Sequence, residues 1–265
     1  MRYALKFGYH GKVYSGYARQ PGLKTVESEI INALKKTRMI DDLEDAQLRV
    51  ASRTDSGVSA CGNVLSLTTG FRKDEILGAL NAHLDDIWFY GMTQVLEDFN
   101  PRHAKNRWYR YHLFNEDIDV SHIQETANIF VGTHDFLNFA KPSGDESTRT
   151  IDSIDVVGEK EGIVLDFKAQ SFMWHMVRRI VKAILDVEEG KLARADIKKA
   201  LDSREKIDYG LAPPWPLILM DVSYDFEFEI HSMKLGDVKI SLEKDIQKLH
   251  MKNIIYDQML KIAQS

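Results

Sequence analysis

The sequence has little of what several common classes of protein require. Its 265 residues include one cysteine, Cys61, so an intramolecular disulfide and a thiolate zinc site are both excluded. No stretch approaches the roughly 18 apolar residues of a membrane-spanning helix. The first residues alternate apolar and polar, unlike the apolar block of a signal peptide. We therefore expect a globular protein in the cytoplasm, without membrane association.

An excess of basic residues is also missing. The net charge is −5, from 35 Lys and Arg against 40 Asp and Glu, which argues against a protein that coats nucleic acid indiscriminately. The charges are nevertheless unevenly distributed, because residues 99–115 contain six Arg, Lys and His side chains and no acid. A local basic cleft is compatible with this distribution.

Signatures of metal and nucleotide binding are absent. The nine histidines are scattered, and no His-Glu-x-x-His pair occurs. The glycines and lysine at residues 8–12 are too closely spaced for a phosphate-binding loop, and no dinucleotide fingerprint follows a strand. The sequence therefore predicts neither a metal nor a cofactor.

The first hundred residues contain a recognisable order of elements. Period-two alternation favours strands, whereas apolar residues three and four apart favour helices. The predicted order is strand 2–9, a helix capped by Thr25, strand 47–51, strand 63–69, helix 73–84 and strand 87–95. This β-α-β-β-α-β order is typical of a ferredoxin-like fold.

The pattern of the second half predicts the same order without sequence identity to the first. The predicted elements are strand 106–114, helix 123–131, strands 149–157 and 163–169, helices 172–187 and 194–201, and strand 217–224. We therefore predict an α+β protein with two tandem ferredoxin-like units, 1–100 and 101–225. Their mostly antiparallel sheets would join around a central cleft. The extension 226–265 is predicted to contain an amphipathic helix over 241–262 that packs on the body or on a partner.

One polar motif lies on the predicted connection between the second and third strands. Residues 52–58 read Ser-Arg-Thr-Asp-Ser-Gly-Val. Asp and Gly are common turn formers, so Asp55 alone is more often structural than functional. Arg53 could orient a carboxylate or hold a phosphate, and Gly57 would let a ligand approach the backbone. The motif makes Asp55 a candidate for chemistry.

Aromatic and basic residues are interleaved at residues 108–111, which read Trp-Tyr-Arg-Tyr. In a strand, Tyr109 and Tyr111 share one face, and Trp108 and Arg110 share the other. Sheet packing accounts for most such patterns. However, aromatic rings beside arginines are also what binds the bases and phosphates of nucleic acids.

A third motif opens the predicted helix at 172–187. Arg178 and Arg179 fall in its first turns, where the positive end of the helix dipole disfavours cations. Each therefore needs an anion, either a protein carboxylate or a phosphate. Arg178 lies along the edge of the predicted buried face, and an ionised Asp55 is a suitable partner.

Together these segments resemble the tRNA pseudouridine synthase A family over most of residues 1–224. Residues 52–58 look like the family's catalytic motif, usually Gly-Arg-Thr-Asp-Ala-Gly-Val. Four other segments match in order: its N-terminal loop at 9–17, the segment with its base-stacking tyrosine at 99–111, and two further motifs at 132–139 and 172–178. Ser52, Ser59 and Ala18 depart from the usual Gly, His and Gln, but no group that the chemistry needs is missing.

The resemblance implies an isomerase that converts uridine to pseudouridine at positions 38, 39 and 40 in the anticodon arm of tRNA. Asp55 would be the nucleophile, without metal or cofactor. Tyr109 would stack on the flipped uracil, and Arg178 would hold Asp55 ionised and aimed. Arg53 would hold the gap in the stem or a phosphate beside it, and the basic run from Arg102 to Arg110 would line an RNA-binding cleft. A homodimer is also implied, with one tRNA able to touch both subunits.

Two other classes of function are compatible with parts of the pattern. A non-catalytic RNA-binding module would use surface aromatics on the two units, and Asp55 would then be a turn residue. A hydrolase of small molecules would use Asp55 as a base. That chemistry needs a second acid or a metal, and the sequence offers no clear candidate for either.

Overall fold

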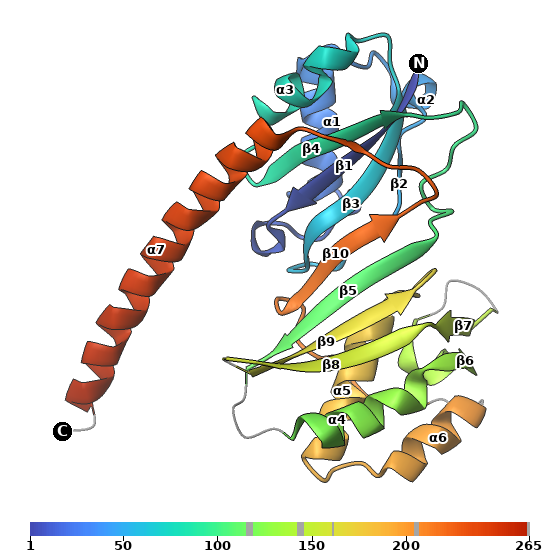
Figure 1. Ribbon diagram of the computed structural model, residues 1–265, viewed down its shortest axis with the longest axis vertical. Helices are drawn as coiled ribbons and strands as arrows, with labels where there is room; N and C mark the ends of the chain where they lie inside the picture. The colour runs from blue at the N-terminus through green and yellow to red at the C-terminus, as the bar shows by residue number, and fades with distance from the viewer. Residues whose placement is uncertain (115–118, 142–145, 161, 204–206, 264–265) are drawn as a thin grey trace.

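The computed structural model describes residues 1–114, 119–141, 146–160, 162–203 and 207–263. These residues form a mixed α+β fold with a mostly antiparallel, nine-stranded sheet (Figure 1), which confirms the predicted fold class at that level. None of the helices in these ranges combines the length and the apolar character needed to cross a membrane.

The first half of the chain contributes one edge of the sheet. Its strands are ordered β4-β1-β3-β2, and every neighbouring pair is antiparallel. The elements are β1 (Arg2–Tyr9), α1 (Val26–Lys36), the short α2 (Leu43–Ala46), β2 (Arg49–Val50), β3 (Ser59–Thr68), α3 (Ile76–Asn81) and β4 (Ile87–Gln94).

The second half repeats this strand order as β10-β5-β9-β8, again with antiparallel neighbours. Its elements are β5 (Asn106–Leu113), α4 (Val120–Ala127), β8 (Ser153–Glu159), β9 (Gly162–Ala169), α5 (Met176–Glu188), α6 (Arg194–Asp202) and β10 (Leu217–Ser223). β10 pairs in parallel with β3 through Ile218 and Leu219. This pairing joins the two halves into one sheet.

The strand predicted at 149–157 is two strands in the structure. β7 (Thr148–Ile151) pairs with β6 (Gly132–Asp135) in a separate two-stranded sheet, and only β8 belongs to the main sheet. Both strands carry β-branched residues, so the alternation of the sequence does not mark the break between them.

The helix predicted at 172–187 begins later, at Met176. His175 precedes it with a φ of 64°, and the backbone carbonyl of Trp174 accepts a hydrogen bond from the Lys141 N–H at 2.8 Å. Phe172 and Met173 pack against the core from this extended segment. In the sequence their positions fit the apolar spacing of a helix. They are apolar because they pack against the core, not because they belong to the helix.

α1 and α5 lie on the same face of the sheet (Figure 1). In Figure 1, α1 lies behind the strands of the first half and α5 behind those of the second. Ile30 and Leu34 of α1 share an apolar core with Phe7 and Phe89 of the strands. Because these large side chains are buried between α1 and the sheet, the loops at the junction of the two halves are not needed for the core and can carry a site.

Local signals explain where α1 begins and ends. The Thr25 side chain accepts a hydrogen bond from the Ser28 N–H at 3.2 Å, and the Ser28 hydroxyl accepts one from the Thr25 N–H at 3.1 Å. Acidic residues occupy the first turn and lysines the last, which complements the helix dipole. The N-terminus of α1 thereby fixes the end of the preceding loop.

The C-terminal extension forms β11 (Glu229–Ile230) and α7 (Ser232–Ala263). α7 begins earlier than the predicted residue 241 and leaves the edge of the sheet next to β4. It extends away from the body in Figure 1, and its side chains from Leu235 to Ile262 are exposed, except for a partly buried Val238. Within the described chain the helix does not pack on the body beyond its start, and packing on a partner, the other alternative of the prediction, stays a prediction.

Candidate active site

Asp55 lies on the loop that connects β2 to β3, and neighbouring tyrosines hold this loop in place. The Thr54 hydroxyl is 2.8 Å from the Tyr9 hydroxyl, and both side chains are buried. The Thr54 carbonyl accepts a hydrogen bond from the Tyr17 N–H at 3.0 Å. Asp55 therefore follows a residue that is fixed through both its side chain and its backbone.

Two glycines explain how the N-terminal loop approaches so closely. A Cβ atom at Gly11 would lie 2.1 Å from the carbonyl oxygen of Val58, and one at Gly16 would lie 3.2 Å from the Ser56 nitrogen. Gly16 also has a φ of 98°, which other residues rarely adopt. The motif at residues 9–17 is thus a support for the Asp55 loop.

Both carboxylate oxygens of Asp55 accept hydrogen bonds, one from the first turn of α5 and one from the segment that precedes it. Arg178 Nη1 donates to Oδ2 at 2.6 Å, and Trp174 Nε1 donates to Oδ1 at 2.8 Å. His175 Nε2 lies 3.5 Å from Oδ2. The Asp55 side chain retains 15% exposure, so the carboxylate is oriented by charge and hydrogen bonds yet remains accessible.

His175 is a neutral neighbour of this pair at physiological pH. Burial lowers the pKa of its imidazole below the ordinary value of 6.5, and the opposing attraction of Asp55 does not restore it. Arg178 and Arg179 lower the pKa further, because they disfavour another positive charge. Arg178 therefore supplies the positive charge that balances Asp55.

Trp174 was not among the predicted site residues. Its backbone pairs with Lys141, and the Lys141 ammonium lies 4.5 Å from the centre of its indole ring. The ring is 54% exposed, although its Nε1 atom is bound to Asp55. The sequence predicted Trp174 within the helix 172–187, and this prediction did not indicate a contact between its side chain and the Asp55 loop.

Arg107 is a second functional candidate that sequence reasoning missed. It is 6% exposed, and its guanidinium bonds to the Ser52 hydroxyl at 3.0 Å and to the Ala51 carbonyl at 2.9 Å. Further bonds go to the carbonyls of Arg102 and Gln170. Arg107 thereby braces the start of the Asp55 loop against β5, and its buried positive charge lies beside the cleft.

A cleft of about 1170 Å³ opens in front of Asp55 between the two halves of the chain. Tyr109 lines it from β5, with its ring edge-on to Phe172 at 5.3 Å between centroids. Burial raises the pKa of the Tyr109 hydroxyl, so the hydroxyl stays protonated near neutral pH. The cleft therefore places an aromatic ring and an ionised carboxylate around one space.

Only some of the basic residues that were predicted at the cleft lie there. Arg53 and Arg102 are exposed and line the cleft. Arg110 lies on the opposite face of the sheet, where it bonds to Asp166 at 2.7 Å and stacks on Trp108. The expectation that the whole run from 102 to 110 lines the cleft is wrong, because strand alternation turns every second residue away.

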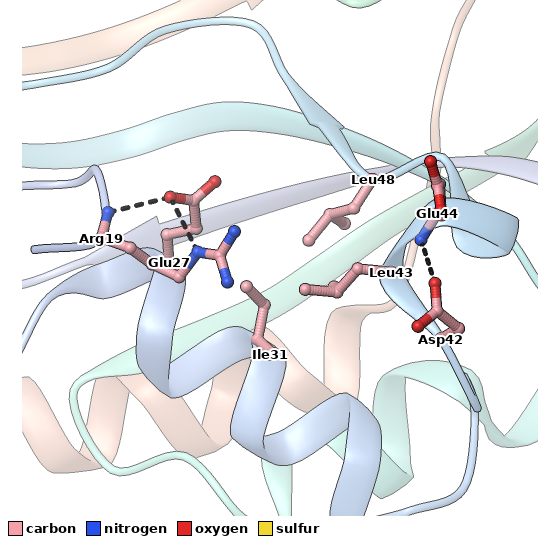
Figure 2. A pocket seen from close by; sticks show the side chains of 7 residues that line it. All are labelled: Arg19, Glu27, Ile31, Asp42, Leu43, Glu44 and Leu48. Atoms are coloured by element: carbon pink, nitrogen blue, oxygen red, sulfur yellow. Dashed lines mark hydrogen bonds and ion pairs between the residues drawn. The ribbon is translucent and has the colours of Figure 1, made fainter. Parts of the chain in front are cut away.

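A second hollow, of about 380 Å³, lies between α1 and α2 (Figure 2). Its lining comprises Arg19, Glu27, Ile31, Asp42, Leu43, Glu44 and Leu48. Glu27 accepts a hydrogen bond from the Arg19 N–H at 2.9 Å, and Asp42 caps α2 through the Glu44 N–H at 2.6 Å. These acids support local structure, so the larger cleft at Asp55 is the candidate active site.

The described part of the chain contains no cluster of three or more His, Cys, Asp or Glu side chains that could hold a metal ion. The groups around Asp55 are instead nitrogen donors and an aromatic ring. This arrangement can orient a carboxylate for attack on a planar substrate, or for proton transfer.

Comparison with known proteins distinguishes between the possible chemistries. Residues 126–225 match the model of a family described as tRNA pseudouridine synthase. The tRNA pseudouridine synthase A of Thermococcus sibiricus is 42% identical over 98% of this chain and 99% of its own length. The chain belongs to the tRNA pseudouridine synthase A family. The members from Pyrococcus horikoshii and Archaeoglobus fulgidus are 38% and 37% identical, over 99% and 93% of this chain and 100% and 92% of their own lengths.

Membership of the tRNA pseudouridine synthase A family makes this protein an isomerase that forms pseudouridine in tRNA. The similarity covers both halves, and therefore both sides of the cleft. The reaction moves a uracil base on its ribose, which requires a group that can hold one fragment while the other turns.

Replacement of Arg178 with methionine tests the pairing with Asp55. The variant removes the charge that faces Oδ2, and an unpaired, partly buried carboxylate is destabilised by about 3 kcal/mol. We expect kcat to fall roughly 100-fold, as measured by single-turnover formation of pseudouridine.

Arg179→Met is the matched control, since Arg179 pairs at 2.8 Å with Asp208, whose side chain is 76% exposed. This variant should retain turnover within about threefold, because the partner of Arg179 is a carboxylate at the surface and not Asp55. Equal losses in the two variants would contradict a specific role for Arg178.

Proposed function

We propose that this enzyme isomerises uridine at positions 38, 39 and 40 in the anticodon arm of tRNA, with Asp55 as the nucleophile. The observation that carries the proposal is the Asp55 carboxylate, held at 2.6 Å by Arg178 and at 2.8 Å by Trp174 at the wall of a cleft that Tyr109 also lines. A carboxylate with both oxygens oriented is poised to form a transient covalent bond with the substrate.

The reaction balances without a redox partner. The N1–C1′ bond of the nucleotide breaks, and a C5–C1′ bond forms after the uracil has turned. The proton on C5 is lost to solvent, and N1 acquires one. Asp55 forms a covalent bond to one fragment, either to C1′ of the ribose or to a ring carbon of the uracil, and this bond breaks again as or after the C5–C1′ bond forms, so the carboxylate is regenerated and the net change is an isomerisation.

The target uridine must leave the stacked anticodon arm before Asp55 can reach it. Such flipping costs a few kcal/mol, and stacking on an aromatic ring returns about 1–3 kcal/mol. Tyr109 is the ring that we assign to this task. Arg53 and Arg102 would bind phosphates or the gap left in the stem, because both are exposed at the cleft and arginine binds phosphate bidentately.

The proposal extends to the domain organisation of the chain. We assign residues 1–100 and 101–225 to two tandem ferredoxin-like units around an RNA-binding cleft, and 226–265 to a helical extension. The equivalent strand orders β4-β1-β3-β2 and β10-β5-β9-β8 support the two units. We further propose that the enzyme acts in the cytoplasm as a homodimer, with no metal or cofactor.

Tritium release from tRNA labelled at C5 of uridine tests the substrate positions. Transcripts that retain one uridine among positions 38, 39 and 40, with cytidine at the other two, should each release tritium. A transcript with cytidine at all three should release none above background. Release from this last transcript, or from none of the four, would contradict the proposed positions.

A further inference from the structure

α7 exposes apolar surface that nothing in the described chain covers. Its 32 residues would span about 48 Å, and the helix contacts the body mainly at its start. In globular proteins most helical stability comes from the packing of an apolar face. Exposed apolar patches of this extent mark interaction surfaces. The helix therefore lacks a partner within its own chain.

One continuous stripe of α7 accounts for much of this surface. Its members are three, four or seven residues apart, which places them on one face of a helix. We define the α7 stripe by Leu235, Leu242, Ile246, Leu249, Tyr256 and Leu260. Each of these six side chains is between 39% and 64% exposed. The stripe is as long as the helix and matches an elongated partner.

The other large apolar residues of α7 lie on its remaining faces and are between 43% and 76% exposed: Ile240, Met251, Ile254, Ile255, Met259 and Ile262. Ile240, Met251 and Ile262 are separated by intervals of eleven residues, with Lys244 and Lys248 near the same side of the helix. This second face explains why the helix is not amphipathic as a whole. It also provides control positions, because Met251 is 57% exposed and Leu249 is 60% exposed.

Charged residues on the two flanks of the α7 stripe are arranged about its middle, with opposite charges at similar distances on either side. Lys239 and Asp257 lie eighteen residues apart, or about five turns, and so share one flank. Asp245 and Lys252 share the other flank. The first pair is centred on position 248 and the second on 248.5. An antiparallel copy of the helix crossing at position 248 would place Lys239 opposite Asp257 on one flank and Asp245 near Lys252 on the other, so that unlike charges meet on both flanks.

The ion pairs that these residues form within α7 do not prevent such an exchange. Lys239 lies 3.8 Å from Glu243, and Lys248 lies 2.8 Å from Asp245. All four side chains are at least 55% exposed, and ion pairs at this level of exposure contribute little. Their geometry can therefore rearrange when a second helix approaches.

We infer that α7 pairs antiparallel with α7 of a second copy of this chain, stripe against stripe. The inference rests on the proposed homodimer and is independent of the role proposed for Asp55. It assigns the dimer contact to the extension, away from the cleft. Each active site would then stay open to tRNA in the assembled enzyme.

Sedimentation equilibrium of the full-length protein tests the face that is used. The wild type is expected to be a dimer. Leu249→Lys should weaken dimerisation at least about tenfold in Kd, and Met251→Lys should leave it within about threefold. A monomeric wild type, equal effects of the two lysines or a larger effect of Met251→Lys would each overturn the inference.

Charge reversal tests the antiparallel register. Asp257→Lys should weaken dimerisation at least about fivefold in Kd, because each introduced lysine would face Lys239 of the partner subunit. The double variant Lys239→Asp/Asp257→Lys should return to within about twofold of the wild type. Failure of this rescue would overturn the pairing.

Tritium release by the same variants at saturating tRNA separates this inference from the catalytic proposal. Wild-type dimers that turn over uridine, combined with an unchanged Kd in Leu249→Lys, would overturn the helix pairing alone. A wild-type dimer that responds to the substitutions as expected would support the pairing even if no tritium were released.

Discussion

Replacement of Asp55 with asparagine is expected to abolish tritium release from uridine-labelled tRNA. An amide is a far weaker nucleophile than a carboxylate, so no covalent intermediate can form. We expect turnover to fall by at least about 10⁴-fold, or more than about 5 kcal/mol in activation free energy. Single-turnover assays at saturating enzyme would measure this loss without a contribution from product release.

The shape of the site should survive this substitution. Trp174 Nε1, which lies 2.8 Å from Oδ1, can still donate to the amide oxygen. The affinity for tRNA should stay within about threefold, because Asp55 adds negative charge to a site that binds a polyanion. The melting temperature should fall by only a few degrees, since Arg178 keeps its bond to the Ala212 carbonyl.

Asp166→Asn is the matched control for Asp55. Asp166 is also bound by an arginine, with 10% of its side chain exposed. Burial raises the pKa of Asp166, but hydrogen bonds from Arg110 and Trp108 outweigh it, and the net pKa is lowered. Its loss should destabilise the fold yet leave turnover within about threefold, because it lies on the other face of the sheet.

The two alternative functions predict different results. In a non-catalytic RNA-binding module, the wild type would release no tritium and Asp55→Asn would be silent. In a hydrolase, Asp55 would activate water, and the wild type would release free uracil instead of pseudouridine. Undiminished tritium release by Asp55→Asn would remove Asp55 from the chemistry altogether.

Much of the fold could be predicted because its signals are local. Alternation in β1 and helical spacing in α1 depend on which side chains face the core, and both are visible in sequence. The parallel contact between β10 and β3 could not be read, because it joins segments about 160 residues apart through backbone atoms. The division of 149–157 into β7 and β8 was missed because both strands carry β-branched residues, so the alternation of the sequence does not mark the break.

Contacts in the site could be predicted from the sequence where a charged residue requires a partner of opposite charge. Arg178 required an anion at the start of a helix, and the structure brings it to Asp55. Trp174 gave no comparable signal, because an indole can pack in a core without a hydrogen-bond partner. Arg107 was hidden among neighbouring basic residues, and only its burial distinguishes it from exposed Arg102.

Replacement of Tyr109 with leucine is expected to reduce turnover below about 10⁻³ of the wild-type rate. Stacking on the flipped base is worth about 1–3 kcal/mol, and misplacement of the reacting atoms by about 1 Å costs a further 100-fold. The affinity for tRNA should stay within about tenfold, or ~1.4 kcal/mol, because most binding energy comes from phosphate contacts. Filter binding and single-turnover assays on the same preparation would measure both quantities.

Trp108→Leu is the control for Tyr109, because it changes an aromatic residue at the next position of the same strand. Trp108 faces away from the cleft, where its Nε1 donates to Asp166 at 2.6 Å. Turnover should therefore stay within about threefold, although the fold loses that hydrogen bond. Normal turnover by Tyr109→Leu would mean that another ring supports the uracil. A loss of tRNA affinity equal to the loss of turnover would make Tyr109 an anchor for tRNA and not a platform for the reacting base.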